Sequence, residues 1–267
     1  MTALLAALLA GVVSGCSLPG GQVAPAATAS AGPAATAALG GILAGSTAVE
    51  IETSGDLLLA GRLFGDGPVG VVVAHGNRPD SAQAGMYRLA AALADEGYRV
   101  LTFNFRGFCP SNPAAGCSDG VSWTGGMHQD VRAAVAYVRQ GGADTVFVVG
   151  SSLGGTAALY AAAQPDAQIA GVVAVSAPQM PGGGSGAPSV TPDVLAAIDV
   201  PKLFIVGGAD GTYARDAEAM FAAATEPKQL EVLPDTSQHG EDLLGGFQRG
   251  LVVQTTDLIL EFIAENA

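Results

Sequence analysis

The segment from Asp144 to Tyr160 constrains the fold of this chain more than any other. Thr145 to Val149 is an apolar, β-branched run typical of a buried strand. Thr156 to Ala163 is rich in alanine and leucine, which favours a helix. Between them, the residues from Gly150 to Gly154 follow the pattern G-x-S-x-G with Ser152 at its centre. The segment therefore predicts a strand, a tight turn that carries a serine, and a helix.

This spacing suits a serine that acts as a nucleophile. A serine on a sharp strand-to-helix turn has strained backbone geometry, and a glycine two residues before and after it lets neighbouring backbone pack closely. The N-terminal N–H groups of the following helix point toward the serine, where negative charge develops when an ester carbonyl is attacked. The alternative is an ordinary glycine-rich turn, because a chain with 38 glycines contains such patterns by chance. The partners of the serine decide between these two interpretations.

Composition excludes several classes of function. The chain has 267 residues and alternates strand-like with helix-like segments, which predicts one α/β domain. Its 11 Lys and Arg against 24 Asp and Glu give a net charge of −13, so a nucleic-acid partner, which needs a basic face, is not expected. Mean hydropathy is +0.39. Even so, beyond the N-terminal region no stretch holds the roughly 18 uninterrupted apolar residues of a membrane-spanning helix.

The N-terminus resembles the signal of a bacterial lipoprotein. Ala3 to Val13 is an apolar run too short to span a membrane, and Val13-Ser14-Gly15-Cys16 resembles a lipobox, whose cysteine is lipidated. No Lys or Arg precedes the apolar run, which departs from the usual signal. We expect a signal peptide over residues 1–15, a lipid anchor on Cys16 and an extracytoplasmic protein held at the cell membrane. The alternatives are an ordinary secretory signal on a secreted protein, or a buried helix of an intracellular one.

Residues 16–46 are rich in Ala, Gly, Pro, Ser and Thr and carry no charge, which predicts a flexible tether. The folded domain is expected over residues 47–267. Within it, hydrophobic patterning and turn residues predict eight strands and the helices between them. The expected strands are Ala48–Thr53, Leu57–Phe64, Val69–Ala74, Arg99–Phe105, Asp144–Gly150, Ile169–Ser176, Lys202–Val206 and Gln229–Leu233. Besides the helix after Ser152, the expected helices are Ser81–Gly97, Asp130–Arg139, Val194–Ile198, Arg215–Ala224 and Glu241–Ala264, the last broken near Gly245, Gly246 and Gly250.

A serine nucleophile needs a base, and the chain offers three histidines. His75 follows an early strand and lies in an expected backbone turn. His128 lies at the start of an expected helix, where a solvent-facing or capping role is the simpler interpretation. His239 follows the last strand, at the end of the strand where open α/β sheets place their sites. By elimination, His239 is the candidate base.

The base in turn needs a carboxylate that fixes its tautomer and stabilises the imidazolium. Asp210 comes directly after the Lys202–Val206 strand and is the first candidate. Its alternative role is that of a simple Asp-Gly turn residue. Asp235 and Asp242 are further candidates, because both lie close to His239 in sequence.

The order Ser152, Asp210, His239, each on a loop after a strand, resembles the α/β-hydrolase superfamily, and in particular its esterases and dienelactone hydrolases. His75-Gly76 and Arg106-Gly107-Phe108, each following a strand, add to the resemblance, which covers roughly residues 47–265. It implies a mostly parallel eight-stranded sheet flanked by helices. It also implies Ser152 as nucleophile, His239 as general base and acid, and Asp210 as the orienting acid.

The same resemblance implies an oxyanion hole formed by the backbone N–H groups of Leu153 and Asn77. His75 would then hold the turn. Many relatives insert a helical lid before the Lys202 strand, but here the connection from Ser176 is short and rich in glycine. We therefore expect no large lid domain and an open site.

Cys109 and Cys117 are eight positions apart in a proline-containing loop, and Cys109 stands where relatives often have glycine. If Cys16 is lipidated, these two cysteines remain and can form a disulfide in an exported protein. The alternative is two free thiols in a cytosolic protein. The spacing does not suit zinc, because no histidine or further cysteine lies nearby.

We therefore predict a serine hydrolase that cleaves carboxylic esters through an acyl-enzyme, without metal or organic cofactor. Its expected partners are a small-molecule or envelope ester substrate and the membrane, and it is expected to be a monomer. One alternative is related chemistry: a peptidase, a thioesterase or an acyltransferase, since the same three residues serve all of them. The other is a non-catalytic envelope lipoprotein that binds a ligand on the same fold.

Overall fold

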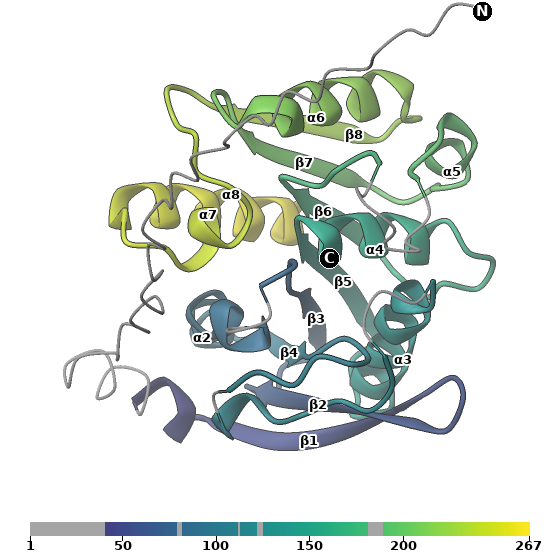
Figure 1. The fold of residues 1–267 in the computed structure, drawn as a ribbon, viewed down its shortest axis with the longest axis vertical. Helices are drawn as coiled ribbons and strands as arrows, with labels where there is room; N and C mark the ends of the chain where they lie inside the picture. The colour runs from purple at the N-terminus through teal and green to yellow at the C-terminus, as the bar shows by residue number, and fades with distance from the viewer. Residues whose placement is uncertain (1–40, 79–81, 112, 122–124, 181–188) are drawn as a thin grey trace, which may run out of the picture.

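Among the described residues, eight strands form a sheet in the order β1-β2-β4-β3-β5-β6-β7-β8 (Figure 1). The structure is a computed structural model and describes residues 41–78, 82–111, 113–121, 125–180 and 189–267. β1 pairs antiparallel with β2, and β2 antiparallel with β4, while the remaining neighbours pair in parallel. The strands are β1 (Ser46–Thr53), β2 (Leu57–Phe64), β3 (Val69–Ala74), β4 (Arg99–Phe103), β5 (Thr145–Ser151), β6 (Gly171–Val175), β7 (Lys202–Gly207) and β8 (Lys228–Leu233).

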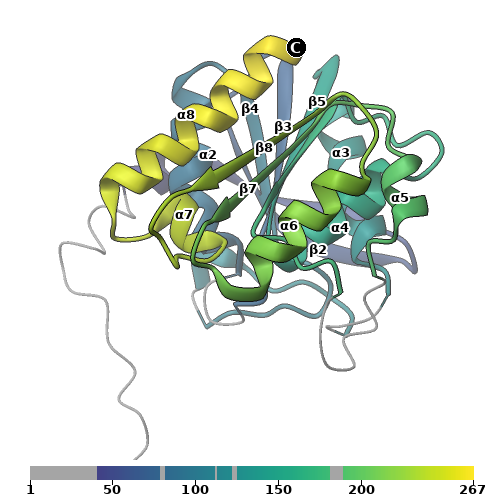
Figure 2. The ribbon, with the colours of Figure 1, turned by 90° about the horizontal axis from the view of Figure 1, so that it is seen from above.

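Helices cover both faces of this sheet (Figure 2). One face carries α2 (Tyr87–Asp95), α7 (Glu241–Gly245) and α8 (Arg249–Asn266). The other carries α3 (Met127–Gln140), α4 (Leu153–Ala162), α5 (Pro192–Ala196) and α6 (Gly211–Ala223). Two short 3₁₀ helices, η1 (Ala82–Met86) and η2 (Pro113–Ala115), lie in connections.

The central strands are apolar on both faces because each face is covered by helices. In β3, Val71 and Val73 pack into the core beneath α2 and α8, while Val72 and Ala74 pack into the core beneath α3 and α4. Side chains alternate between the two faces of a strand, so a strand buried on both sides becomes a continuous apolar run. This is the physical reason that such runs predicted the strands.

The predicted fold is confirmed: a mostly parallel eight-stranded sheet with flanking helices. Between β6 and β7 the described residues form only the five-residue helix α5, so no large lid domain is present there. The predicted break in the C-terminal helix is also present, since α7 ends at Gly245 and α8 begins at Arg249.

The N-terminal boundary differs from the prediction. Residues 41–44 are helical, and the side chains of Ile42 and Leu43 pack against the core on the α2 and α8 face. The tether was expected to extend to residue 46, but these two apolar residues give its last part a surface to bury. The expected signal peptide, Cys16 and the tether up to residue 40 lie outside the described residues. No helix in the described part of the chain is long and apolar enough to cross a membrane.

Candidate active site

Three loops meet at the carboxyl-end edge of the parallel strands. Ser152 follows β5, Asp210 comes shortly after β7, and His239 lies in the loop after β8. Neighbouring parallel strands end at the same edge, so residues far apart in sequence come together there. The site thus forms where the fold brings these loops together.

The turn after β5 has the strained geometry that its sequence predicted. Ser152 has φ of +49° and ψ of −119°, a conformation that is costly for a residue with a side chain. A Cβ on Gly154 would lie 2.5 Å from the carbonyl oxygens of Ala74 and His75, and a Cβ on Gly150 would collide with the backbone of Gly154. Both glycines of the pattern are therefore required by close packing, and the serine is raised at the start of α4.

A chain of hydrogen bonds joins the three predicted residues. His239 Nε2 lies 2.9 Å from Ser152 Oγ, and His239 Nδ1 lies 2.9 Å from Asp210 Oδ2. Because an ionised carboxylate only accepts hydrogen bonds, the Nδ1 atom carries the proton. Nε2 is then free of hydrogen and can take the proton of the serine hydroxyl. This arrangement is chemically able to activate the serine as a nucleophile.

The alternatives to Asp210 are placed elsewhere. The Asp242 carboxylate binds Arg78, with 2.6 Å between Asp242 Oδ2 and Arg78 Nη2. Asp235 is exposed and occupies a turn with φ of +54°. Asp210 itself is 7% exposed and directly precedes α6. Of the three candidate carboxylates, only Asp210 contacts the imidazole of His239.

His75 has a structural environment. It is fully buried between the rings of Phe105 and Phe108, and its Nε2 accepts a hydrogen bond from the Phe105 N–H at 3.1 Å. Its Nδ1 therefore carries the proton and donates to the Gly76 carbonyl at 2.6 Å. Burial lowers the pKa of His75 from 6.5 to about 4, so the ring is neutral at pH 7. His128, as expected, lies at the start of α3 and is half-buried.

The two backbone N–H groups predicted to form the oxyanion hole belong to Asn77, in the loop after β3, and to Leu153. The Gly76 carbonyl is held by the His75 ring and by the Arg78 N–H at 3.0 Å. In a trans peptide the N–H points opposite to the carbonyl, so the Asn77 N–H points away from His75. Asn77 lines the same cavity as Ser152. Leu153 provides the first N–H of α4. The assignment of these two amides as oxyanion donors stays a prediction.

The cavity around Ser152 has a volume of about 210 Å³ and is lined mostly by residues with polar side chains. Three of its residues were not identified from the sequence: Arg78, Tyr213 and Glu241. The Tyr213 ring packs on the imidazole of His239, with 4.0 Å between ring centroids, and limits its movement. Tyr213 and Glu241 lie three and two residues beyond Asp210 and His239, respectively. That proximity in sequence was the only available signal. The lining residues are Gly76, Asn77, Arg78, Ser151, Ser152, Tyr213, His239 and Glu241.

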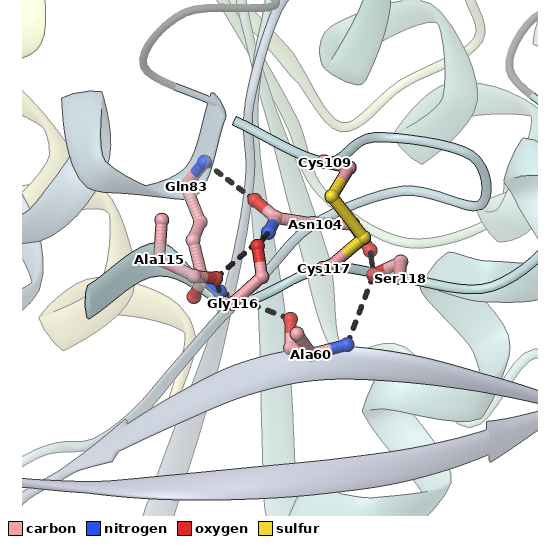
Figure 3. The surroundings of a disulfide bond; sticks show 8 residues. All are labelled: Ala60, Gln83, Asn104, Cys109, Ala115, Gly116, Cys117 and Ser118. Carbon is pink, nitrogen blue, oxygen red and sulfur yellow. Dashed lines mark hydrogen bonds between the residues drawn. A yellow bond between two sulfur atoms is a disulfide. The ribbon is translucent and has the colours of Figure 1, made fainter. Parts of the chain in front are cut away.

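A disulfide joins Cys109 and Cys117, as predicted, and closes the loop after β4 (Figure 3). Ser118, the next residue, donates its hydroxyl to the Asn104 carbonyl at 2.8 Å and accepts from the Ala60 N–H of β2 at 2.9 Å. The closed loop is therefore attached to the sheet through β2 and the end of β4.

Asn104 and Gln83 connect this loop to η1 (Figure 3). Asn104 Nδ2 donates to the Ala115 and Gly116 carbonyls at 2.8 and 3.0 Å, and its Oδ1 accepts from the Gln83 N–H at 3.0 Å. Gln83 Nε2 donates to the carbonyls of Ala60 and Ala115. Both side chains are buried, and each serves backbone groups of other segments. The sequence gave no pattern that would have identified them.

Within the described residues, no group of three or more His, Cys, Asp or Glu side chains is arranged to hold a metal ion. The Cys109 and Cys117 sulfurs bind each other.

Residues 71–229 match a protein family described as alpha/beta hydrolase fold. An uncharacterised protein of Mycobacterium tuberculosis, from strains CDC 1551 and H37Rv, is 31% identical over 265 residues, which cover 89% of this chain and 85% of the relative.

Solved structures of low sequence identity share the fold. An esterase from Pyrococcus furiosus has a TM-score of 0.65 and 20% identity, covering 83% of this chain and 90% of that chain. A dienelactone hydrolase from Anabaena variabilis has a TM-score of 0.63 and 20% identity, covering 83% of this chain and 97% of that chain.

Proposed function

Because this chain belongs to the α/β-hydrolase fold family, we propose that it is a serine hydrolase that cleaves carboxylic esters. One observation carries the proposal: the hydrogen-bonded chain of Ser152, His239 and Asp210 at the edge of a cavity. The similarity in fold to an esterase and a dienelactone hydrolase supports the choice of ester chemistry.

In the proposed first step, Ser152 Oγ attacks the ester carbonyl carbon while its proton passes to His239 Nε2. Asp210 holds the Nδ1–H and stabilises the resulting imidazolium. The carbonyl oxygen becomes an anion and accepts hydrogen bonds from the N–H groups of Leu153 and Asn77. Collapse of this intermediate breaks the bond to the alcohol oxygen, which takes the proton from Nε2 and leaves.

The second step repeats this chemistry with water. His239 Nε2 takes a proton from the water as its oxygen attacks the acyl-enzyme carbonyl, and the proton then returns to Ser152 Oγ as the carboxylic acid leaves. The scheme uses only side chains and backbone amides of this chain. It calls for no metal or organic cofactor.

Labelling with a fluorescent fluorophosphonate tests the proposal. The wild-type protein should be labelled, and Ser152→Ala should not, because only a serine activated by a base reacts at an appreciable rate. Ser111→Ala is the matched control, since it removes the hydroxyl of an exposed serine outside the cavity and should leave labelling in place. Turnover of p-nitrophenyl acetate, a thioester and a peptide amide then separates ester hydrolysis from the related acyl chemistries.

Absence of labelling in well-folded wild-type protein would refute the hydrolase proposal and favour the ligand-binding lipoprotein. Labelling without turnover of any hydrolytic substrate would favour acyl transfer to an acceptor other than water.

We also propose that the enzyme acts outside the cytoplasm, anchored through lipid on Cys16. The signal-like sequence over residues 1–15 supports this location. Cys16→Ser should release the protein from the membrane fraction of the native host. Unchanged retention of that variant in the membrane would refute the lipid anchor.

A further inference from the structure

We propose that Glu241 is a positioning residue that holds the loop from Gly76 to Arg78, and with it the Asn77 N–H, in the geometry needed to bind the oxyanion. This inference rests on the proposed function, because it assigns Glu241 a role in that reaction. It adds a residue to the site that lies outside the hydrogen-bonded chain of Ser152, His239 and Asp210.

The first observation is a buried contact across the chain. Glu241 Oε1 accepts a hydrogen bond from the Gly76 N–H at 3.0 Å, although the two residues are 165 positions apart. The Glu241 residue is only 6% exposed. A buried carboxylate is costly unless it is hydrogen-bonded or paired, so its position is held by specific contacts.

The Glu241 contact restrains the first of two successive peptide groups, and other contacts restrain the second. Glu241 holds the N–H of the peptide between His75 and Gly76. The next peptide, between Gly76 and Asn77, has its carbonyl held by His75 Nδ1 and by the Arg78 N–H. With both peptide planes restrained, the direction of the Asn77 N–H is set before substrate arrives. Preorganised donors of this kind lower the barrier because they need no reorientation during the reaction.

Ion pairs also join the loop from Gly76 to Arg78 with the segment that contains Glu241 and Asp242. Arg78 Nη2 lies 2.6 Å from Asp242 Oδ2, and Arg78 Nε lies 3.7 Å from Glu241 Oε2. Arg78 is 47% exposed, so these ion pairs add little stability by themselves. They do place the positive charge of Arg78 beside the Glu241 carboxylate. This positive charge partly offsets the negative charge of the carboxylate, which lies near the developing oxyanion.

The position of Glu241 couples the proposed base to the proposed donor. The segment from His239 to Asp242 supplies the imidazole and, two residues later, the carboxylate that holds the Gly76 amide. A Cβ on Gly76 would lie 3.1 Å from Ser152 Cβ and 3.5 Å from Glu241 Oε1, which shows how closely these groups approach. A single short segment therefore sets the position of two functional groups relative to the serine.

Two variants separate the hydrogen bond from the charge. Glu241→Gln keeps an oxygen acceptor at the same reach and removes the charge, whereas Glu241→Asp keeps the charge and withdraws it by one methylene. Glu218→Ala, at an exposed position of α6, is the matched control. Active-site titration with a fluorophosphonate gives the concentration of reactive Ser152, and kcat and KM for p-nitrophenyl acetate are then expressed per reactive site.

We expect Glu241→Asp to lower kcat roughly tenfold to hundredfold with KM changed by less than about threefold, because an oxyanion donor acts in the transition state. Glu241→Gln should stay within about threefold of wild type, since it can still accept from the Gly76 N–H. A role limited to stability would change the number of reactive sites and leave kcat per site alone. Wild-type kcat in Glu241→Asp, or an equal loss in Glu241→Gln, would overturn the proposal.

Hydrogen–deuterium exchange tests the positioning without relying on activity. The peptide that contains His75 to Arg78 should exchange faster in Glu241→Asp than in wild type, and Glu218→Ala should show no such change. Equal exchange in all three proteins would overturn the inference even if the enzyme is active. If wild type neither reacts with the fluorophosphonate nor turns over ester, the proposed function fails, and the inferred role fails with it even where exchange confirms the contact.

Discussion

Two histidines in this molecule follow strands at the same edge of the sheet, yet their partners differ in kind. His75 is fully buried, and both ring nitrogens bind backbone groups, the Phe105 N–H and the Gly76 carbonyl. The side chain of His239 is 28% exposed, and both of its nitrogens face side chains, those of Asp210 and Ser152.

This difference shows how the hydrogen-bond partners of an imidazole determine whether its proton is fixed or can move. A backbone N–H always donates and a backbone carbonyl always accepts, so the proton on His75 has one fixed position. A serine hydroxyl can both donate and accept, and it can lose its proton to the ring. His75 is therefore suited to hold a loop, and His239 to move a proton.

The largest effect is expected when His239 is removed. His239→Ala should lower kcat for ester hydrolysis by roughly 10⁶-fold, because no base remains to take the Ser152 proton. Its unfolding free energy should change by less than about 1 kcal/mol, since the ring is partly exposed. Kinetics and urea unfolding measure the two quantities. Activity above about one per cent of wild type would show that His239 is not the base.

Asp210→Asn keeps the shape of the site and changes the proton assignment. An amide can donate to Nδ1, which favours the tautomer with hydrogen on Nε2 and prevents that atom from taking the serine proton. We expect kcat to fall roughly 10⁴-fold. Asp235→Asn, at an exposed turn, serves as the control and should keep wild-type kcat. A comparable loss in the Asp235 variant would contradict the assignment.

Replacing His75 should mainly lower the free energy of unfolding. His75→Leu leaves the buried Phe105 N–H and the Gly76 carbonyl without their side-chain partner, which costs about 3 kcal/mol of unfolding free energy. His128→Leu, at a half-buried position without these two partners, should cost less than about 1 kcal/mol. Urea unfolding at pH 7.5 compares the two variants. Equal losses would remove the contrast between a fully buried and a half-buried histidine.

Acid should weaken the fold through the same residue. The pKa of His75 is about 4 in the folded protein and 6.5 when exposed to solvent. As pH falls below 6.5, the unfolded chain binds the proton before the folded one does, so the His75 contribution is complete above 6.5 and is lost toward pH 4. The loss reaches about 3 kcal/mol. Urea unfolding between pH 7.5 and 4 should show a smaller pH dependence in His75→Leu than in wild type. Identical slopes would contradict the lowered pKa.

Reduction of the disulfide should have the smallest effect. A closed loop with a sequence separation of eight contributes about 2–3 kcal/mol in the chain-entropy model. Phe108, beside Cys109, packs on His75, and neither cysteine lines the cavity around Ser152. Dithiothreitol should therefore lower the melting temperature, while fluorophosphonate labelling at 25 °C changes by less than about threefold. Labelling of Cys109 or Cys117 by a thiol reagent in untreated, unfolded protein would refute the disulfide.

The sequence predicted those parts of the molecule whose signals are local. Ser152 could be proposed as the nucleophile because the glycines around it are required by packing within one turn. Asp210 and His239 could be proposed as its partners because each follows an apolar strand, and the edge of a parallel sheet collects such residues. The start of α6 was less accurate: the helix begins at Gly211, four residues before the predicted Arg215. Gly211, Thr212 and Tyr213 lack apolar periodicity, which explains the late prediction.

Other contacts between distant segments carry no such local signal and could not be predicted. Glu241 and Gly76 meet only because β3 and the loop after β8 end at one edge, and a single sequence does not encode that pair as a pattern. Asn104 and Gln83 bind backbone carbonyls, and a carbonyl belongs to every residue type. Ile42 and Leu43 were interpreted as part of a tether because most of their neighbours are small residues with little side chain to bury. They are partly buried only because the core on the α2 and α8 face offers an apolar surface against which they pack.

The separation of the site residues along the chain has a consequence for how activity appears during folding. Ser152 and His239 are 87 residues apart, and Gly76 and Glu241 are 165 apart. A partly folded chain that has not docked β8 and α7 holds Ser152 without His239, and the loop after β3 without Glu241. Reactivity toward a fluorophosphonate should then arise in one late step, together with closure of the longest-range contacts. The rate of fluorophosphonate labelling during refolding then reports completion of the sheet, without any label introduced into the chain beforehand.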